Sequence, residues 1–390
     1  MTEPYVHIDA SMAFDPATGY RQLRDMCPVH HVAEHDPPFY VVGRFGDVVD
    51  TLKQPDLWGN RAGPGVFHQD SGVLGSADDP DHARHRAVLR NAFVPTAIAR
   101  MEPTLMAMAD ELLDEIVPLG AGDFVPLFAF PFPALAIGEL LGVPPADRHI
   151  FRELSSATVA ALTGGDVAAY QRSRDALGDY VDARLAERAA REGHTDDVLS
   201  VLGAARDDGR LSPGEVRHLG HQLLVAGHET TTSLLAMMLH RLLERPALLQ
   251  QLRADPSLIP VAVEEAIRFD SPVTGLFRTN VEATTVHGVE IAEGTKLQVL
   301  YASANRDPAQ FRDPDEFRLD RPRHELGRHV GFGWGIHHCI GAPLARLEAK
   351  VAFTRLLARM ADIELAGAPV RNESFVLHGL TSLPLRWRAA

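Results

Sequence analysis

A long helix predicted in the middle of the chain constrains the fold more than any other sequence feature. Its start is marked by Ser212-Pro213-Gly214-Glu215, a capping box with serine before the helix, proline at its first position and glutamate three residues after the cap. Helical periodicity continues to about Arg245, just before Pro246, which makes roughly 33 residues or about 50 Å. A helix of that length crosses a whole domain, so we expect it to lie through the core.

This predicted helix carries a polar insert. Its apolar residues 223–226 are followed by the sequence Gly227-His228-Glu229-Thr230-Thr231-Thr232. A carboxylate and hydroxyl groups inside a core are costly unless they are used. The threonines either serve a functional site or bond back to the preceding turn and bend the helix, and this segment alone leaves both interpretations open.

The rest of the chain predicts a mainly α-helical fold with small β-sheets. Strand-like runs at Phe39–Val42 and at residues 297–301 interrupt the helical periodicity. Residues 59–75 are rich in glycine and predict a long irregular loop, a kind of segment that is often functional. The 390 residues contain no linker, charge block or internal repeat, so we expect one domain over residues 1–390, with a β-rich N-terminal part and an α-rich remainder.

Charge and cysteine content exclude several classes of protein. A net charge of −14 without a basic tract argues against binding to nucleic acid. An acidic N-terminus without a signal-peptide core, and the absence of a run of about 18 apolar residues, predict a cytoplasmic protein that does not enter a membrane. Because Cys27 and Cys339 are the only cysteines, a disulfide framework and a four-cysteine zinc site are excluded.

Residues 329–341 form the segment that decides the chemistry. Four glycines within eleven residues surround Cys339, and an apolar helix is predicted for residues 342–360. Glycine lets the backbone approach a flat ligand closely and turn N–H groups toward the sulfur. A thiol just before a helix start is favoured as thiolate, and a thiolate on haem iron pushes electron density toward O–O cleavage. The segment therefore suits an oxygen-activating iron ligand.

A zinc or copper site is the competing interpretation of the same segment. It would use His329, His337, His338 and Cys339. Adjacent residues of one loop rarely converge on a single metal, and no second, distant ligand cluster is evident in the sequence. We therefore disfavour it.

These segments resemble the cytochrome P-450 family. The family's signature Phe-x-x-Gly-x-x-x-Cys-x-Gly is matched by Phe332, Gly335, Cys339 and Gly341. Its oxygen-activating helix motif is matched by Ala226-Gly227-x-Glu229-Thr230, and its Glu-x-x-Arg pair by Glu265 and Arg268. The resemblance extends from Asp79-Pro80-Asp81-His82 through Asn305-Arg306-Asp307-Pro308 to Gly379-Leu380-Thr381-Ser382-Leu383-Pro384, and so covers nearly the whole chain. His228 and Trp334 occupy positions at which relatives vary.

The resemblance implies a cytochrome P-450 fold, with the long central helix over the haem and the cysteine loop beneath it. It also implies haem b with the Cys339 thiolate as axial iron ligand. The residues that match those holding the haem propionates are His82, Arg86, Arg278 and His337; the i,i+4 spacing puts the first two on one helix face. Structural roles are implied for Glu265, Arg268, Arg321 and Phe332.

The implied activity is that of a monooxygenase, which hydroxylates an apolar small molecule with O₂ and two electrons supplied from outside. Glu229 and Thr230 would relay protons. A peroxide-driven hydroxylase is the runner-up, which the acid–alcohol pair disfavours because peroxide brings its own protons; a non-catalytic haem sensor would not need that pair. Substrate-pocket walls, each of which could instead be ordinary core, are predicted at Val66, Phe67, Leu223, Ala226, Val273, Leu276, Phe277 and Leu380.

Electron transfer is expected to come from separate proteins. Similarity to soluble bacterial members implies a ferredoxin, an NAD(P)H-dependent ferredoxin reductase and a monomeric enzyme. Basic residues around the cysteine loop predict a docking surface for an acidic partner, or alternatively a solvated helix face. They are Arg323, Arg328, Arg346, Lys350, Arg355 and Arg359, against the acidic Glu325 and Glu348.

Overall fold

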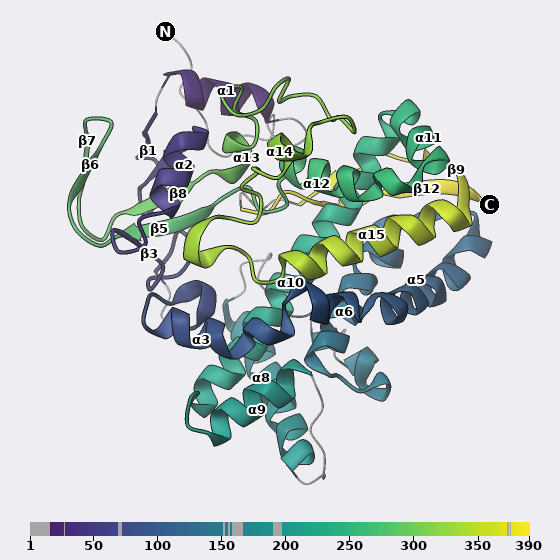
Figure 1. Cartoon of the computed structure of the whole chain (residues 1–390), viewed down its shortest axis with the longest axis horizontal. Coiled ribbons are helices and arrows are strands. Elements are labelled where there is room, and N and C mark those ends of the chain that lie inside the picture. Colours follow the sequence, from purple (N-terminus) through teal and green to yellow (C-terminus); the bar gives the residue numbers. More distant parts are fainter. Residues whose placement is uncertain are drawn as a thin grey trace. The chain divides into compact units, whose positions relative to one another are not determined.

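The structure is a computed structural model that describes residues 16–26, 28–68, 72–150, 153–154, 157, 167–189, 197–372, 374 and 376–390. The chain divides into two compact units, whose helices and strands are labelled in Figure 1. The first unit comprises Met1–His82, Pro260–Cys339 and Ser374–Gly379. The second comprises Ala83–Ile259, Ile340–Glu373 and Leu380–Ala390. This architecture is mainly helical with small sheets, as the sequence predicts.

The first unit is built on a five-stranded sheet of order β1-β2-β8-β5-β3. Its strands are β1 (His30–Val32), β2 (Phe39–Val42), β3 (Trp58–Gly59), β5 (Leu276–Asn280) and β8 (Lys296–Val299), with the hairpin β6 (Thr284–Val286) and β7 (Val289–Ile291) between the last two. Its helices are α1 (Ala17–Met26), α2 (Phe45–Leu52), α12 (Ile259–Asp270), α13 (Tyr301–Ala304) and α14 (Arg323–Leu326), with short helical turns η2 (Leu74–Ser76) and η8 (Gly335–His337). Helix α3 (Asp81–Leu89) has its first two residues in this unit.

The middle of this sheet is buried on both faces. Strand β2 runs parallel to β8, and β8 runs antiparallel to β5. Apolar side chains of β2, β8 and α2 form one core cluster, and Phe39 and Val41 of β2 belong to a second, which explains why β2 is a nearly continuous apolar run. The predicted strand Phe39–Val42 is confirmed. Of the second run, only residues 297–299 lie in a strand, β8, which begins one residue earlier at Lys296, because Leu300 caps α13 and Tyr301 begins it.

The glycine-rich loop is irregular, as predicted. Between Gly59, which ends β3, and Leu74, which begins η2, the described residues form no helix or strand; residues 69–71 lie outside the described part. The Lys296 ammonium donates to the carbonyls of Ala62 and Gly63 at 2.8 Å each and ties the loop to β8.

The second unit is organised around α10 (Pro213–Leu243). The predicted capping box is present: Ser212 Oγ accepts from the Glu215 backbone N–H at 3.2 Å, and the Glu215 carboxylate accepts from the Ser212 N–H at 2.7 Å. The helix ends two residues before the predicted end, with Glu244 as its C-cap. From Thr231 to Leu242 every residue is buried, as expected of a helix that runs through a core.

Other helices of this unit pack around α10, and two small sheets complete it. Helix α10 contacts α6, α8 and α15. The helices are α4 (Pro95–Ala99), α5 (Glu102–Ile116), α6 (Pro131–Leu141), α8 (Val167–Ala189), α9 (Val198–Asp207), α11 (Pro246–Ala254) and α15 (Ala342–Arg359), with short turns η3 (Arg90–Ala92), η4 (Val117–Leu119), η5 (Val125–Ala129), η6 (Pro145–Asp147) and η7 (Pro256–Leu258). The strands are β4 (Ala121–Asp123), β9 (Met360–Leu365), β10 (Val370–Arg371), β11 (Leu380–Ser382) and β12 (Pro384–Ala389), paired as β4-β12-β9 and β10-β11.

Two further findings concern these helices. Helix α15 ends one residue before the predicted position, because Met360 enters β9. Among the described residues, none of the helices is both long enough and apolar enough to span a bilayer.

Candidate active site

The loop that carries Cys339 is closed by its own backbone. The Cys339 N–H donates to the Phe332 carbonyl, and the Gly333 N–H donates to the Val330 carbonyl, both at 2.8 Å. Gly333 and Gly335 both have φ of +71°. A Cβ atom on Gly335 would lie 2.6 Å from the Leu52 carbonyl oxygen, so this position accepts only glycine without strain.

The loop presents its thiol outward. Cys339 is exposed, and α15 begins three residues later in the chain, at Ala342. Asn305 fixes the start of the loop, because its side-chain oxygen accepts a hydrogen bond from the Val330 N–H at 2.7 Å. A loop that is fixed at its base and exposes a thiol is suited to bind an external iron centre.

Two of the predicted propionate ligands lie together in the first unit. The His82 and His337 rings are 4.2 Å apart between centroids, and His82 is almost fully buried. Arg278, on β5, is 3% exposed and donates to the Phe277 carbonyl at 3.0 Å. Arg86 follows His82 one turn later on α3 and is half-buried.

Three of the four residues with implied structural roles, Glu265, Arg268 and Arg321, form one buried cluster, and the fourth, Phe332, lies in the cysteine loop. The Glu265 carboxylate accepts two hydrogen bonds from Arg268 at 2.8 Å each, and others from Arg321 at 3.1 and 3.3 Å. Arg268 also donates to the carbonyls of Asn305 and Pro314. The cluster thus ties α12 to two irregular segments that precede the cysteine loop.

The histidines of the alternative metal site do not converge. His329 Nε2 lies 2.9 Å from the Glu264 carboxylate, whereas His337 contacts His82. Within the described part of the chain, no group of three or more His, Cys, Asp or Glu residues could hold a metal ion. Glu264 was not identified from the sequence, because it lies outside the segments that were singled out there. Asn305 lies in one of those segments, but its role in holding the loop was not predicted.

The polar insert of α10 has a defined hydrogen-bond pattern. Thr230 Oγ1 donates to the Ala226 carbonyl at 2.7 Å, and Thr232 Oγ1 donates to the His228 carbonyl at 3.0 Å. The back-bonding that the sequence left open is therefore present, and each hydroxyl oxygen keeps acceptor capacity. Burial raises the pKa of the Glu229 carboxyl, which favours its protonated form.

The predicted pocket residues differ in their surroundings. Val66 and Phe277 belong to a buried cluster with Phe39, which favours ordinary core for these two. Val273 and Leu276 are partly buried against the other core cluster of the sheet. The remaining four are the exposed Phe67 and Ala226 and the buried Leu223 and Leu380.

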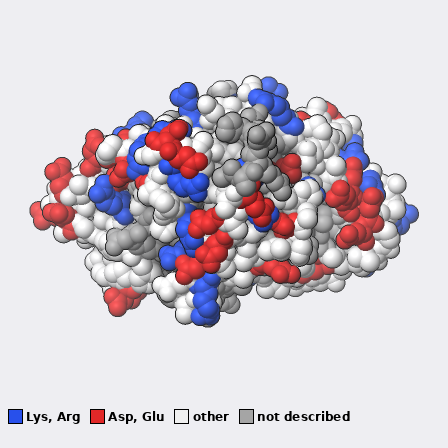
Figure 2. All heavy atoms as spheres, turned by 90° about the horizontal axis from the view of Figure 1, so that it is seen from below, with Lys and Arg blue, Asp and Glu red and all other residues white. Residues whose placement is uncertain are grey.

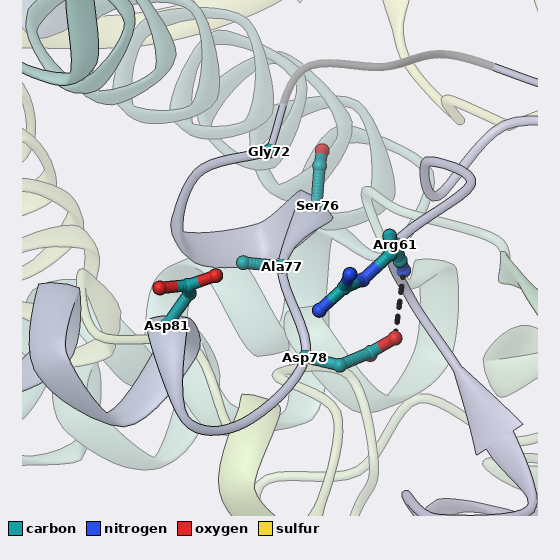
Figure 3. A pocket seen from close by; sticks show the side chains of 6 residues that line it. All are labelled: Arg61, Gly72, Ser76, Ala77, Asp78 and Asp81. Carbon is teal, nitrogen blue, oxygen red and sulfur yellow. Dashed lines mark hydrogen bonds between the residues drawn. The ribbon is translucent and has the colours of Figure 1, made fainter.

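A small polar cavity lies beside α3. It measures about 190 Å³ and is lined by Arg61, Gly72, Ser76, Ala77, Asp78 and Asp81 (Figure 3). The Asp78 carboxylate accepts from the backbone N–H groups of Asn60 at 2.6 Å and of Arg61 at 3.1 Å. Binding pockets for small organic ligands usually measure about 300–1,000 Å³. The cavity is smaller than such pockets, and Asp78, which lines it, fixes the loop through backbone hydrogen bonds. We therefore interpret these residues as anchoring the loop and not as a ligand site.

Three of the basic residues that α15 contributes to the predicted docking surface are paired with acidic residues, which favours the alternative of a solvated helix face for these three. Lys350 lies 2.7 Å from Glu102, and Arg355 lies 2.7 Å from Asp110. Arg359 pairs with Asp110 and Asp114, and these acids are on α5. On the face that Figure 2 draws, Lys and Arg lie among Asp and Glu in small groups. A sequence count of charges could not include the acids that α5 contributes.

Comparisons with known proteins identify the family. The family model "Cytochrome P-450" matches residues 162–361. The chain is 40% identical over 316 residues to Cytochrome P-450 107B1 of Saccharopolyspora erythraea. The aligned region covers 80% of this chain and 76% of that protein. It is 35% identical to Cytochrome P-450 monooxygenase PikC of Streptomyces venezuelae, over 96% and 92% of the two chains.

A solved structure agrees with this assignment. The Bacillus subtilis polyketide-synthase cytochrome P-450 PksS superposes with a TM-score of 0.89 at 32% identity, over 100% of both chains. Fold, length and sequence thus match this family together. The chain therefore belongs to the cytochrome P-450 family and is a haem-thiolate monooxygenase.

Proposed function

We propose that Cys339 is the axial thiolate ligand of haem b in this monooxygenase. The observation that carries the proposal is the glycine loop, closed by the hydrogen bond between the Cys339 N–H and the Phe332 carbonyl, which exposes the thiol. Haem bound through a thiolate supplies the activation of O₂. Backbone N–H groups and glycines around the sulfur suit the approach of a flat macrocycle.

The propionates would be held by His82, His337, Arg278 and Arg86. The rings of the two histidines are close enough to donate to one carboxylate. Arg278 is buried, and the hydrogen bond described for its guanidinium goes to the carbonyl of Phe277, the preceding residue. A buried guanidinium requires an anionic or polar partner, and a propionate would satisfy its other N–H groups.

Glu229 and Thr230 are proposed to relay protons to the oxygen-binding side. Because burial raises the pKa of Glu229, its carboxyl holds a proton more readily than an exposed glutamate does and can pass it on. Thr230 Oγ1 is fixed by its bond to the Ala226 carbonyl and can still accept a hydrogen bond. The pair would thus deliver protons in a defined direction.

The substrate is proposed to be an apolar small molecule. Its pocket would be lined by Phe67, Leu223, Ala226, Val273, Leu276 and Leu380, whereas Val66 and Phe277 contribute to the core. A ferredoxin and its NAD(P)H-dependent reductase would supply the two electrons. We further propose that both units form one monomeric domain, and that the protein is cytoplasmic.

The decisive experiment is the spectrum of the reduced carbon monoxide complex. The purified protein should carry haem and give the red-shifted band of thiolate ligation, and Cys339→Ser should abolish that band. Cys27→Ser is the matched control and should keep it. A colourless protein with stoichiometric zinc, or an unchanged band in Cys339→Ser, would contradict the ligand assignment.

A further inference from the structure

His228 makes an unusual contact next to the proposed relay pair. It is fully buried on α10, directly before Glu229 and Thr230. Its Nε2 lies 2.9 Å from the Phe130 carbonyl oxygen, and its ring lies 4.1 Å from the Phe130 ring at an interplanar angle of 62°. Neither hydroxyl nor carboxyl of the relay pair takes part in this contact.

The group that His228 contacts belongs to a well-fixed part of the second unit. Phe130 lies between the π-helical turn η5 and the start of α6. Phe124, Phe128 and Phe132 stack along this segment, with ring centroids 5.6 and 5.5 Å apart. Turn η5 also packs against α10 and β11. A bond to this carbonyl therefore anchors α10 to a closely packed neighbour.

The imidazole must act as a donor here, because its partner is a carbonyl oxygen. Burial lowers the pKa of His228 to about 4, so the ring is neutral at physiological pH. The proton of the neutral ring must then reside on Nε2. Without this donor, the partly buried Phe130 carbonyl would lose a hydrogen bond.

The hydrogen bond between His228 and the Phe130 carbonyl lies on a different side of α10 from the side chains of Glu229 and Thr230. Successive residues of a helix are turned by about 100°, so Glu229 and Thr230 point about 100° and 200° away from His228. Close helix contact supports the same geometry, since a Cβ on Gly227 would lie 3.1 Å from Ile137 of α6. Any rotation of α10 at this turn would therefore redirect both relay side chains.

We propose that His228 is a positioning residue, which locks the rotation of α10 by donating to the Phe130 carbonyl and so fixes the direction of Glu229 and Thr230. This inference rests on the relay role proposed above for that pair. It assigns a function to a position at which the sequence indicates none.

Two variants separate the hydrogen bond from the shape of the side chain. His228→Phe keeps a ring of similar size and removes the donor, whereas His228→Gln keeps an N–H donor at a similar reach. Amide hydrogen exchange of residues 226–232 should accelerate about tenfold in His228→Phe and stay near wild type in His228→Gln. This readout does not depend on turnover.

Electron accounting gives the second readout, with 7-ethoxycoumarin as an apolar probe and a ferredoxin–reductase pair. The fraction of NADPH electrons recovered as peroxide should rise about threefold in His228→Phe and little in His228→Gln. Thr230→Ala is measured beside them. If Thr230→Ala does not raise peroxide, the relay proposal fails, and hydrogen exchange still decides whether His228 anchors the turn.

Several results would overturn the positioning role while leaving the relay intact. One is Thr230→Ala raising peroxide while His228→Phe leaves both peroxide and hydrogen exchange at wild-type values. Another is an equal effect of both His228 variants, which would indicate packing rather than the hydrogen bond. A third, independent of any variant, is a ¹⁵N spectrum at pH 7 that shows the proton of His228 on Nδ1.

Discussion

The backbone N–H of Cys339 donates to the carbonyl of Phe332 at 2.8 Å. This single bond turns residues 332–339 into a closed loop and sets where the thiol leaves it. The turn requires left-handed backbone at Gly333 and Gly335, both with φ of +71°. The signature of the family can thus be understood as the set of residues that this closed loop needs.

Gly335→Ala should destabilise the protein and prevent haem loading. A side chain there combines left-handed strain with a contact of 2.6 Å to the Leu52 carbonyl, so we expect a loss of at least about 2 kcal/mol. Gly333→Ala is the matched control: it has the same φ, but its nearest contact is 3.7 Å away. Urea unfolding and the haem-to-protein absorbance ratio measure both variants, and equal losses would refute the role of the Leu52 contact.

Glu265→Gln should lower the yield of folded, haem-loaded protein rather than change product selectivity. Its carboxylate is fully buried between Arg268 and Arg321, and breaking such a cluster leaves buried cations without their counter-charge. The expected loss of unfolding free energy is about 3–5 kcal/mol. Asp114→Asn removes one of the two acidic partners of Arg359 at the surface and should leave the unfolding free energy close to that of wild type. Normal stability with altered products would argue against a structural role.

Sequence reasoning succeeded where the signal is local. The capping box at Ser212 and the strand Phe39–Val42 depend on residues that are neighbours in the chain, and both are confirmed. It failed where partners are distant: β12 pairs with β4 across more than 250 residues, and the α5 acids that neutralise α15 have no trace in the α15 sequence. The residues around Cys339 indicate an iron ligand by themselves, whereas the proton-relay role of Glu229 and Thr230 came from a resemblance, because no local rule assigns it.

Arg328→Glu should slow reduction by ferredoxin and weaken its dependence on salt. Arg328 is exposed and lies eleven residues before Cys339, whereas Arg359 is paired with Asp110 and Asp114. A paired cation contributes little to the field that steers an acidic partner. Arg359→Glu is therefore the control and should leave the association rate nearly unchanged. Stopped-flow reduction at several ionic strengths measures both, and the opposite order would restore α15 as the docking surface.

Thr230→Ala should keep haem and substrate affinity but divert most NAD(P)H electrons to peroxide, because protons no longer arrive in order. Thr230→Ser restores the hydroxyl and should recover coupling. Thr232→Ala removes a back-bond of the same kind, two residues further along α10 and buried, and should leave coupling intact. Peroxide and NAD(P)H are quantified in the same reaction. Equal effects of Thr230→Ala and Thr232→Ala would point to helix bending instead of proton relay.

The last prediction concerns Glu348, a carboxyl buried inside the second unit. It is 1% exposed, and its Oε2 has no hydrogen-bond partner in the described part of the chain. Burial raises the pKa of this carboxyl well above its ordinary value of 4.5, so the folded protein favours the neutral form. Below pH 4.5 the group is neutral in both folded and unfolded chains, and its burial has no ionisation cost.

Above that pH the unfolded chain ionises while the folded chain does not, so wild-type stability falls by about 1.4 kcal/mol per pH unit until the folded pKa is reached. Glu348→Gln removes this term. The variant should match wild type near pH 4 and become progressively more stable than wild type as the pH rises above 4.5, as measured by urea unfolding. Glu364→Gln, at an exposed position on β9, tests whether loss of a surface charge has the same effect. A stability difference that does not change with pH would mean that Glu348 is ionised in the folded protein, and a partner for it would then have to be sought.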